Sequence, residues 1–353
     1  MDKKIIFGKR LKSAREMKGL SMADLVEKLA DIVSKQAISK YEAGKMLPNS
    51  TVLIKLAEVL DVKVDYLFRP FTVSISDIEF RKKAKMTEKA RKSVEQHVMD
   101  HVERYFEIEE ITGINCKASL LRTDDIISSR QDVIKLVQKI RENWDLGEDG
   151  ITDVISLLEN HGIKVIEFDA PSEFDGLSGT AGDDIVIVLN SNIHPTERKR
   201  FTALHELGHL LMKFDKSVDD KAKEKLCHAF ASEFLIPSKI FRDIIGDISK
   251  RTLNMVAFAE IQHNFGISID ALIKKAEDEG MITGNRHKNY HIRKNTNPSF
   301  KQYVEKSRIE NEHPRRFISL VYDAYSKSLI SVSKAATLLN IPVSDVLDKA
   351  LFV

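Results

Sequence analysis

Residues 201–212 read Phe-Thr-Ala-Leu-His-Glu-Leu-Gly-His-Leu-Leu-Met, with His205 and His209 four positions apart. On a helix this spacing puts both imidazoles on one face, where they can hold one Zn²⁺ with Glu206 beside them as general base. The surrounding leucines predict a buried helix, in which imidazole and carboxylate groups need polar partners. The alternative is a core helix with two hydrogen-bonded histidines.

The composition is typical of a globular protein with room for two or three domains, since 42% of its 353 residues are hydrophobic and 31% are charged. No apolar run reaches the length of a membrane span, and the first residues lack the apolar core of a signal peptide. Cys116 and Cys227 are far apart in the sequence and indicate no disulfide framework. We therefore expect a cytoplasmic protein without a membrane partner.

The N-terminal segment, residues 1–69, is basic and predicts an all-α bundle. It holds 14 lysines and arginines against 9 aspartates and glutamates, whereas the rest of the chain is slightly acidic. Ser21 and Asp24 have the spacing of a capping box, and Ser34 can cap the following helix. We expect helices at 5–18, after Ser21, and at 35–43, 52–60 and 64–68.

Residues 33–48 of this segment resemble the Xre/Cro-like family of phage-type repressors. The resemblance implies a helix-turn-helix domain that binds double-stranded DNA, with its recognition helix here. The turn at 30–33 is about two residues longer than is usual in the family. Proteins of this kind read DNA half-sites as dimers, so a homodimer is compatible with this prediction. The alternative to a DNA-binding domain is a protein-binding module with a basic face. The predicted DNA contacts are Lys35, Gln36, Ser39, Lys40 and Lys45.

Residues 70–120 predict a helical linker with a possible dimer contact. The stretch 78–110 is rich in charge, and its apolar residues recur about every four positions, as on one face of a long helix. His97 and His101 are also four apart, but no acidic residue with catalytic spacing follows them. We expect both histidines at the surface.

Residues 121–280 predict an α+β domain with a small sheet packed on helices. Amphipathic helices are expected at 132–144 and 151–161. The period then changes, and 164–168 and 184–190 have the β-branched runs of strands. A glycine-rich stretch at 174–182 predicts a weaker strand between them.

A tetrahedral zinc site with two histidines needs a third protein ligand and an open position for water. Glu224 and Glu233 are the candidates, 15 and 24 residues after His209. Residues 224–237 resemble the second motif of the ImmA/IrrE-type metallopeptidases, a gluzincin-like family, and 197–202 and 265–272 fit that family too. The resemblance implies a zincin-like fold in which Glu224 is the third Zn²⁺ ligand and Glu206 is catalytic.

His228 replaces the Asn or Asp that is usual in this motif. It follows Glu224 by four positions and thus shares its side of the helix. We expect it either to orient a ligand histidine or to compete as a ligand.

Residues 281–353 predict a helical C-terminal module. The basic run 286–294 favours a solvated linker, and 333–339 resemble half of a helix-turn-helix, which favours docking or dimerisation. We interpret the chain as a DNA-binding regulator fused to a zinc endopeptidase. The family resemblance implies cleavage of an Xre-type repressor, or of the chain itself, in a stress or mobile-element response. The alternatives are a repressor or antitoxin with a non-catalytic sensor domain, and a cytosolic peptidase with an interaction module.

Overall fold

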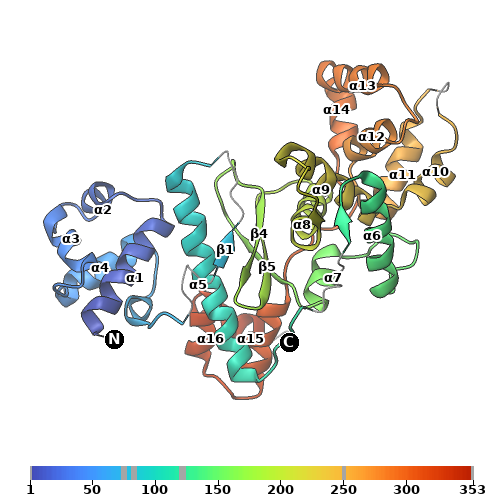
Figure 1. Ribbon diagram of the computed structural model, residues 1–353. Helices are drawn as coiled ribbons and strands as arrows, with labels where there is room; N and C mark the ends of the chain where they lie inside the picture. Colours follow the sequence, from blue (N-terminus) through green and yellow to red (C-terminus); the bar gives the residue numbers. More distant parts are fainter. Residues whose placement is uncertain (1, 73–77, 81–85, 119–124, 249–251, 351–353) are drawn as a thin grey trace. The chain divides into compact units, whose positions relative to one another are not determined.

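The computed structural model describes residues 2–72, 78–80, 86–118, 125–248 and 252–350. The chain divides into two compact units, which are described separately (Figure 1). One unit comprises residues 1–116, 180–183 and 315–353, and the other comprises 117–179 and 184–314. No helix in these described ranges is long and apolar enough to cross a membrane.

The N-terminal part of the first unit contains the five predicted elements. The Ser21–Asp24 capping box is present, and Ser34 accepts a hydrogen bond from the Ala37 N–H at 3.2 Å. The last element is a 3₁₀ helix. The elements are α1 (Lys3–Met17), α2 (Met22–Lys28), α3 (Lys35–Glu42), α4 (Ser50–Leu60) and η1 (Val64–Phe68).

The long turn before α3 has an unusual backbone. Ala30 and Asp31 have φ values of 51° and 55°, so two consecutive residues adopt the left-handed conformation. Left-handed residues other than glycine are uncommon, although Asp adopts the conformation more readily than Ala. The turn between α2 and α3 thus contains two residues in an uncommon backbone conformation.

The bundle core depends on a very close approach of α1 to α3. Phe7, Leu11 and Ile38 are fully buried between the helices. A Cβ atom added to Gly8 would lie 2.4 Å from the carbonyl oxygen of Tyr41, so only glycine fits at this position. The helices are also joined by Arg15, whose Nε donates to Glu42 Oε1 at 2.6 Å.

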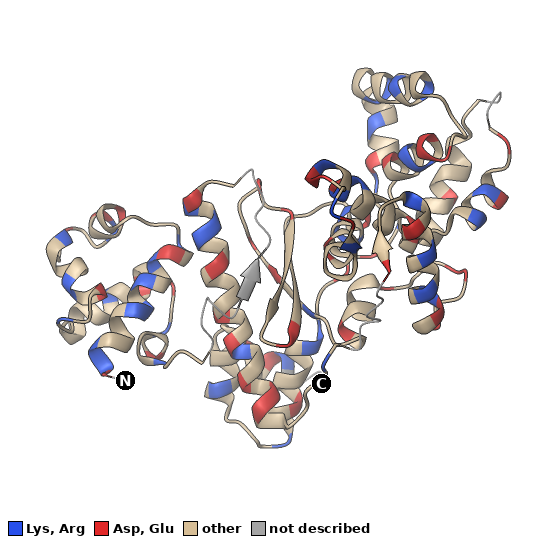
Figure 2. Ribbon diagram, viewed as in Figure 1, with Lys and Arg blue, Asp and Glu red and all other residues tan. Residues whose placement is uncertain are grey.

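The first unit continues with β1 (Ile78–Phe80) and the long helix α5 (Glu88–Thr112). The predicted helix over 78–110 is therefore wrong at its start, where 78–80 are a strand and 81–85 lie outside the described residues. Acidic and basic residues both occur along α5 (Figure 2). Its apolar face packs against α1 and against α15 (Arg316–Ser326). The last helices of this unit are α16 (Val332–Leu339) and α17 (Val343–Ala350).

The expected surface position of His97 and His101 is wrong. Both side chains are partly buried on α5, and the His101 ring lies 5.0 Å from the ring of Phe317. Burial lowers the pKa of both imidazoles, that of His101 to about 3. The C-terminal helix α15 covers the face of α5 that carries His101, and the spacing of residues along α5 does not indicate this contact.

The second unit contains the predicted small sheet. β3 (Lys164–Phe168) and β5 (Asp184–Asn190) are parallel, with Val165 opposite Ile187, and their bounds agree with the prediction. The glycine-rich stretch forms β4 (Gly176–Ala181), on the other side of β5. A second pair joins β2 (Ile126–Ile127) and β6 (Lys213–Phe214) in parallel. The structure thus confirms a small sheet among helices.

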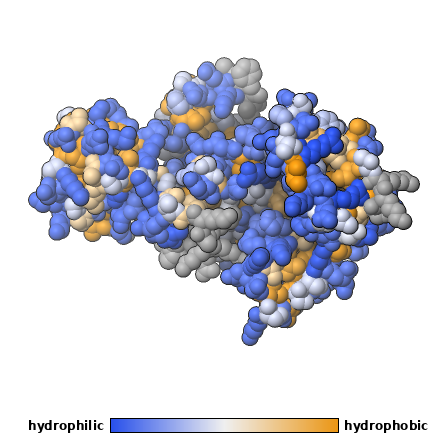
Figure 3. All heavy atoms as spheres, turned by 90° about the horizontal axis from the view of Figure 1, so that it is seen from above, coloured by the Kyte–Doolittle hydropathy of each residue, from blue (hydrophilic) through white to orange (hydrophobic). Residues whose placement is uncertain are grey.

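The helices of the second unit surround one large apolar core. The basic run 286–294 lies within a helix whose Tyr290 is buried, so the expected solvated linker is wrong. Hydrophilic residues cover most of the face of the molecule in Figure 3. The helices are α6 (Arg130–Asn143), α7 (Val154–Asn160), α8 (Thr196–Leu211), α9 (Asp220–Leu235), α10 (Ser238–Ile245), α11 (Met255–Phe265), α12 (Ile269–Asp278), α13 (Gly284–Thr296) and α14 (Pro298–Glu305).

The contact at Gly8 gives a prediction for stability. Helix propensity alone would make Gly8→Ala stabilising by about 1 kcal/mol, but the added Cβ clashes with the backbone of α3. We expect a net loss of about 1–3 kcal/mol in the free energy of unfolding, measured by urea denaturation. Lys9→Ala, at an exposed position of the same helix, is the control and should change little. A Gly8→Ala protein as stable as the wild type would contradict the packing of α1 on α3.

The buried His101 predicts a pH dependence. Its folded pKa lies below its ordinary value of 6.5, so its contribution to stability is present above pH 6.5 and is lost as the pH falls toward about 3. His101→Gln should reduce the loss of stability between pH 6.5 and 5, by a fraction of the ~1.4 kcal/mol per pH unit that one proton contributes. The exposed His194→Gln is the control. Identical pH profiles for wild type and His101→Gln would refute this role.

Candidate functional site

The centre of the site is the pair of histidines on α8. The Nε2 atoms of His205 and His209 lie 3.2 Å apart, and each residue is 7% exposed. The helix reaches the sheet through β5 and packs against α9. The predicted helical spacing is thus realised, and both imidazoles point at the same location.

Glu224 on α9 completes a group of three. Its Oε2 lies 3.2 Å from His205 Nε2, and its Oε1 lies 3.2 Å from His209 Nε2. All ligand atoms lie within 4.8 Å of one another, and among the described residues this is the one such group of three His, Cys, Asp or Glu side chains. Two imidazoles and one carboxylate are a donor set that suits Zn²⁺, so the cluster could bind a metal.

Glu206 lies between the histidines in sequence and is 1% exposed. Its Oε2 accepts a hydrogen bond at 3.0 Å from the hydroxyl of Ser178, which projects from β4. A Cβ on Gly176 would lie 2.9 Å from Thr202 Cγ2, so the glycine lets β4 run close to α8. No local sequence pattern indicates Ser178, because its partner is 28 residues away and only the folded sheet brings the two together.

Two further residues of α9 lie next to the histidines. Cys227, which is buried, places its Sγ 3.3 Å from His209 Nδ1. The exposed ring of His228 lies 4.5 Å from that of His205 and 5.7 Å from that of Phe201. No spacing rule links Cys227 to His209 either.

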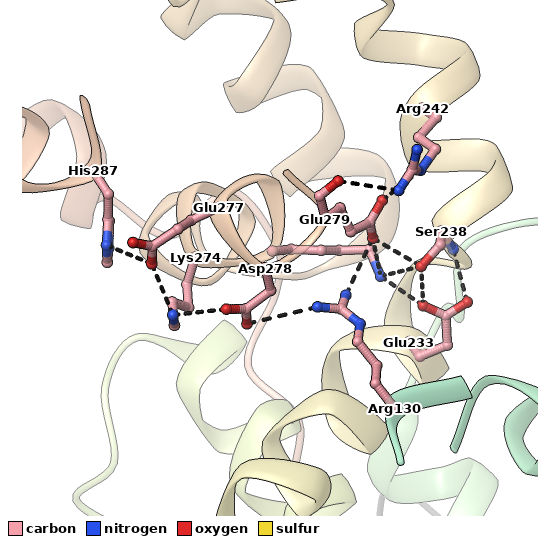
Figure 4. A network of polar contacts seen from close by, with 10 residues as sticks. Arg130, Glu233, Ser238, Arg242, Lys274, Glu277, Asp278, Glu279 and His287 are labelled. Atoms are coloured by element: carbon pink, nitrogen blue, oxygen red, sulfur yellow. Dashed lines mark hydrogen bonds and ion pairs between the residues drawn. The ribbon is translucent and has the colours of Figure 1, made fainter. Parts of the chain in front are cut away.

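Glu233, the other candidate ligand, has different partners. It is buried, forms an ion pair at 2.7 Å with Lys275, and accepts a hydrogen bond at 2.8 Å from the Ser238 N–H. A network of acidic and basic side chains from α6, α9, α10 and α12 extends from these residues (Figure 4). Glu233 therefore serves the packing of α9 on α12.

A pocket of about 570 Å³ opens beside the metal-binding cluster. Phe201 and His228, the two rings next to His205, form part of its wall. Ser232 on α9 and Ala271 on α12 also line it. Arg130, Lys274 and Lys275 also line it, and each has an acidic partner in the network of Figure 4. These charges are thus compensated, and most of the surface that lines the pocket is apolar.

The predicted DNA contacts share the outer face of α3 and the turn after it. Ile38 and Tyr41 point into the bundle core. The exposed residues are Lys35, Gln36, Ser39, Lys40 and Lys45.

Comparisons with known proteins agree with both parts of the chain. Residues 158–277 match the family described as the IrrE N-terminal-like domain, peptidase family M78, and residues 11–67 match the helix-turn-helix family. The cluster of His205, His209 and Glu224 lies within the first match, and α3 lies within the second.

Two proteins of Bacillus subtilis (strain 168) are similar over 64 residues, or 18% of this chain. The SPbeta prophage-derived uncharacterized HTH-type transcriptional regulator YonR is 38% identical over 57% of its length, and the uncharacterized HTH-type transcriptional regulator YqaE is 33% identical over 53%. The chain spans about half the length of these curated relatives. It therefore carries an Xre-type helix-turn-helix domain at its N-terminus and an IrrE N-terminal-like domain of the M78 peptidase family at residues 158–277.

Proposed function

We propose that the chain is a DNA-binding regulator that is also a zinc-dependent endopeptidase. The observation that carries the proposal is the convergence of His205, His209 and Glu224 on one point, with Glu206 buried beside them. The exposed polar face of α3, on a domain of the Xre type, supports the DNA-binding half. Binding to DNA also favours a location in the cytoplasm.

The chemistry follows from the placement of these side chains. Held by His205, His209 and Glu224, Zn²⁺ would lower the pKa of a water toward neutrality. Glu206 would accept a proton from the attacking water and deliver it to the leaving amine of the peptide. Ser178 fixes the orientation of the carboxylate by donating to Oε2, and Cys227 contacts the far nitrogen of His209 and restrains its ring.

The substrate proposed is a repressor-type protein or the chain itself. A DNA-binding domain on the same chain brings the peptidase to the proteins bound near its operator. Both substrates are compatible with a regulator that is released from DNA by cleavage under stress or on induction of a mobile element. The alternative is a repressor or antitoxin in which the same cluster binds a metal and cleaves nothing.

Replacement of Glu206 tests the enzymatic half. We expect Glu206→Gln to keep about one zinc per chain and to lose cleavage by about 10²–10⁴-fold, since the amide accepts no proton. His205→Ala should lose the metal, as measured by elemental analysis. Cleavage is followed by mass spectrometry of the chain alone and mixed with an Xre-type repressor.

The exposed Glu173→Gln is the matched control and should cleave as the wild type does. If Glu206→Gln cleaved equally well, the proposed proton transfer would be wrong. Zinc in the wild type without cleavage of either substrate would favour the sensor alternative.

Replacement of the α3 face tests the DNA-binding half. We expect Lys35→Ala with Gln36→Ala to weaken binding to a selected operator by about 1–3 kcal/mol, because a base-edge contact and a phosphate contact are lost. The measurement is fluorescence anisotropy at fixed salt. Lys55→Ala, at a partly exposed position of α4, removes one positive charge elsewhere and should bind nearly normally. Normal affinity of the double variant would refute the assignment of α3 as the recognition helix.

A further inference from the structure

Helix α13 carries a second pair of histidines with the geometry of the first. His287 and His291 are four apart, their Nε2 atoms lie 3.0 Å apart, and their ring centroids are 4.7 Å apart. The corresponding values for His205 and His209 are 3.2 Å and 4.8 Å. In both pairs the two Nε2 atoms thus converge on one point.

The orientation of His287 is set by a carboxylate. Its Nδ1 lies 2.9 Å from Oε2 of Glu277 on α12, and Figure 4 shows the imidazole facing this group. When Nδ1 donates its hydrogen to the carboxylate, Nε2 carries the lone pair that a metal needs. A carboxylate behind a ligand histidine is the usual support of metal-binding imidazoles.

The surroundings of the pair suit a cation from solution. Both histidines are partly exposed, so an ion can reach them. The lysines nearby are already paired with acids: Lys274 lies 2.7 Å from both Glu277 Oε2 and Asp278 Oδ1. Lys294 likewise lies 2.5 Å from Asp270 Oδ2. Their charges are therefore largely compensated.

Helical spacing alone does not produce such a site. His97 and His101 have the same separation, but His101 packs its ring against Phe317 on α15. On α13 the two rings instead approach each other with their Nε2 atoms, and one ring has a carboxylate behind it.

We propose that His287 and His291 form a second metal site that binds a divalent transition metal. The chain supplies two imidazole nitrogens, and water fills the remaining positions, because no third acidic or sulfur ligand joins the pair among the described residues. Imidazole pairs favour Cu²⁺ over Ni²⁺ and Zn²⁺. The site is independent of the proposed peptidase activity. The competing explanation is a single hydrogen bond between the two rings.

The test is Cu²⁺ binding to the full chain, purified without a histidine tag and stripped of metal. In the variant His205→Ala with His209→Ala, we expect one Cu²⁺ per chain, with nitrogen hyperfine coupling in its electron paramagnetic resonance spectrum. Adding His287→Gln and His291→Gln should abolish that ion, whereas adding His263→Ala, an exposed histidine, should not. Glu277→Gln should weaken the affinity by about tenfold or more.

Two results would overturn the proposal. One is a His205→Ala, His209→Ala protein that is folded by circular dichroism and binds no Cu²⁺ at millimolar concentration. The other is an ion that stays bound with unchanged affinity after both α13 histidines are replaced. In the wild type, a second bound Cu²⁺ with nitrogen hyperfine coupling would support the proposal without any substitution. Cu²⁺ binding by the α13 histidines is measured in a variant that lacks His205 and His209. A failure of the proposed zinc peptidase activity therefore leaves this measurement unchanged, and the two proposals are tested separately.

Discussion

The close crossing of α8 and α9 is the constraint on which the site depends. A Cβ on Gly208 would lie 3.1 Å from the ring of Phe230, so the glycine allows the aromatic side chain to pack directly on the helix backbone. Glu224 lies less than two turns before Phe230 on the same helix and therefore reaches both histidines. The apolar packing of α8 on α9 thus brings the carboxylate of Glu224 to the two imidazoles.

Buried charges fix the other end of α8. Lys199 Nζ lies 2.5 Å from Glu167 Oε1 on β3, and Arg200 Nε donates to Glu312 Oε1 at 2.6 Å. Glu312 also accepts hydrogen bonds from the N–H groups of Val154 and Ile155 at the start of α7. Buried ion pairs add little net stability, because desolvation offsets the attraction. Their effect is to hold α8 in one orientation between the sheet and α7, which keeps Glu206 opposite Ser178.

The sequence predicts those features whose physical origin is local. The spacing of His205 and His209, the capping box at Ser21 and the β-branched runs of β3 and β5 each depend on neighbours within a few residues, and each is found in the structure. Ser178 and Cys227 act through partners on other elements, and no local pattern identifies them. His101 shows the opposite error, because helical spacing places it on a face that a distant helix, α15, then covers.

The burial of the cluster is uneven, and this asymmetry constrains how a substrate can approach. The imidazole side chains are 9% exposed, whereas the Glu224 side chain is 56% exposed. Access to the point where the three groups converge is therefore from the side of α9. The exposed ring of His228 lies on this side, and so does the pocket whose wall it shares with Phe201. For the proposed peptidase, this open side is therefore where a peptide would reach the three groups. To carry the proton in the proposed reaction, Glu206 must lie within hydrogen-bond reach of both the attacking water and the leaving amine, so the scissile bond would have to bind next to Glu206 and the two imidazoles.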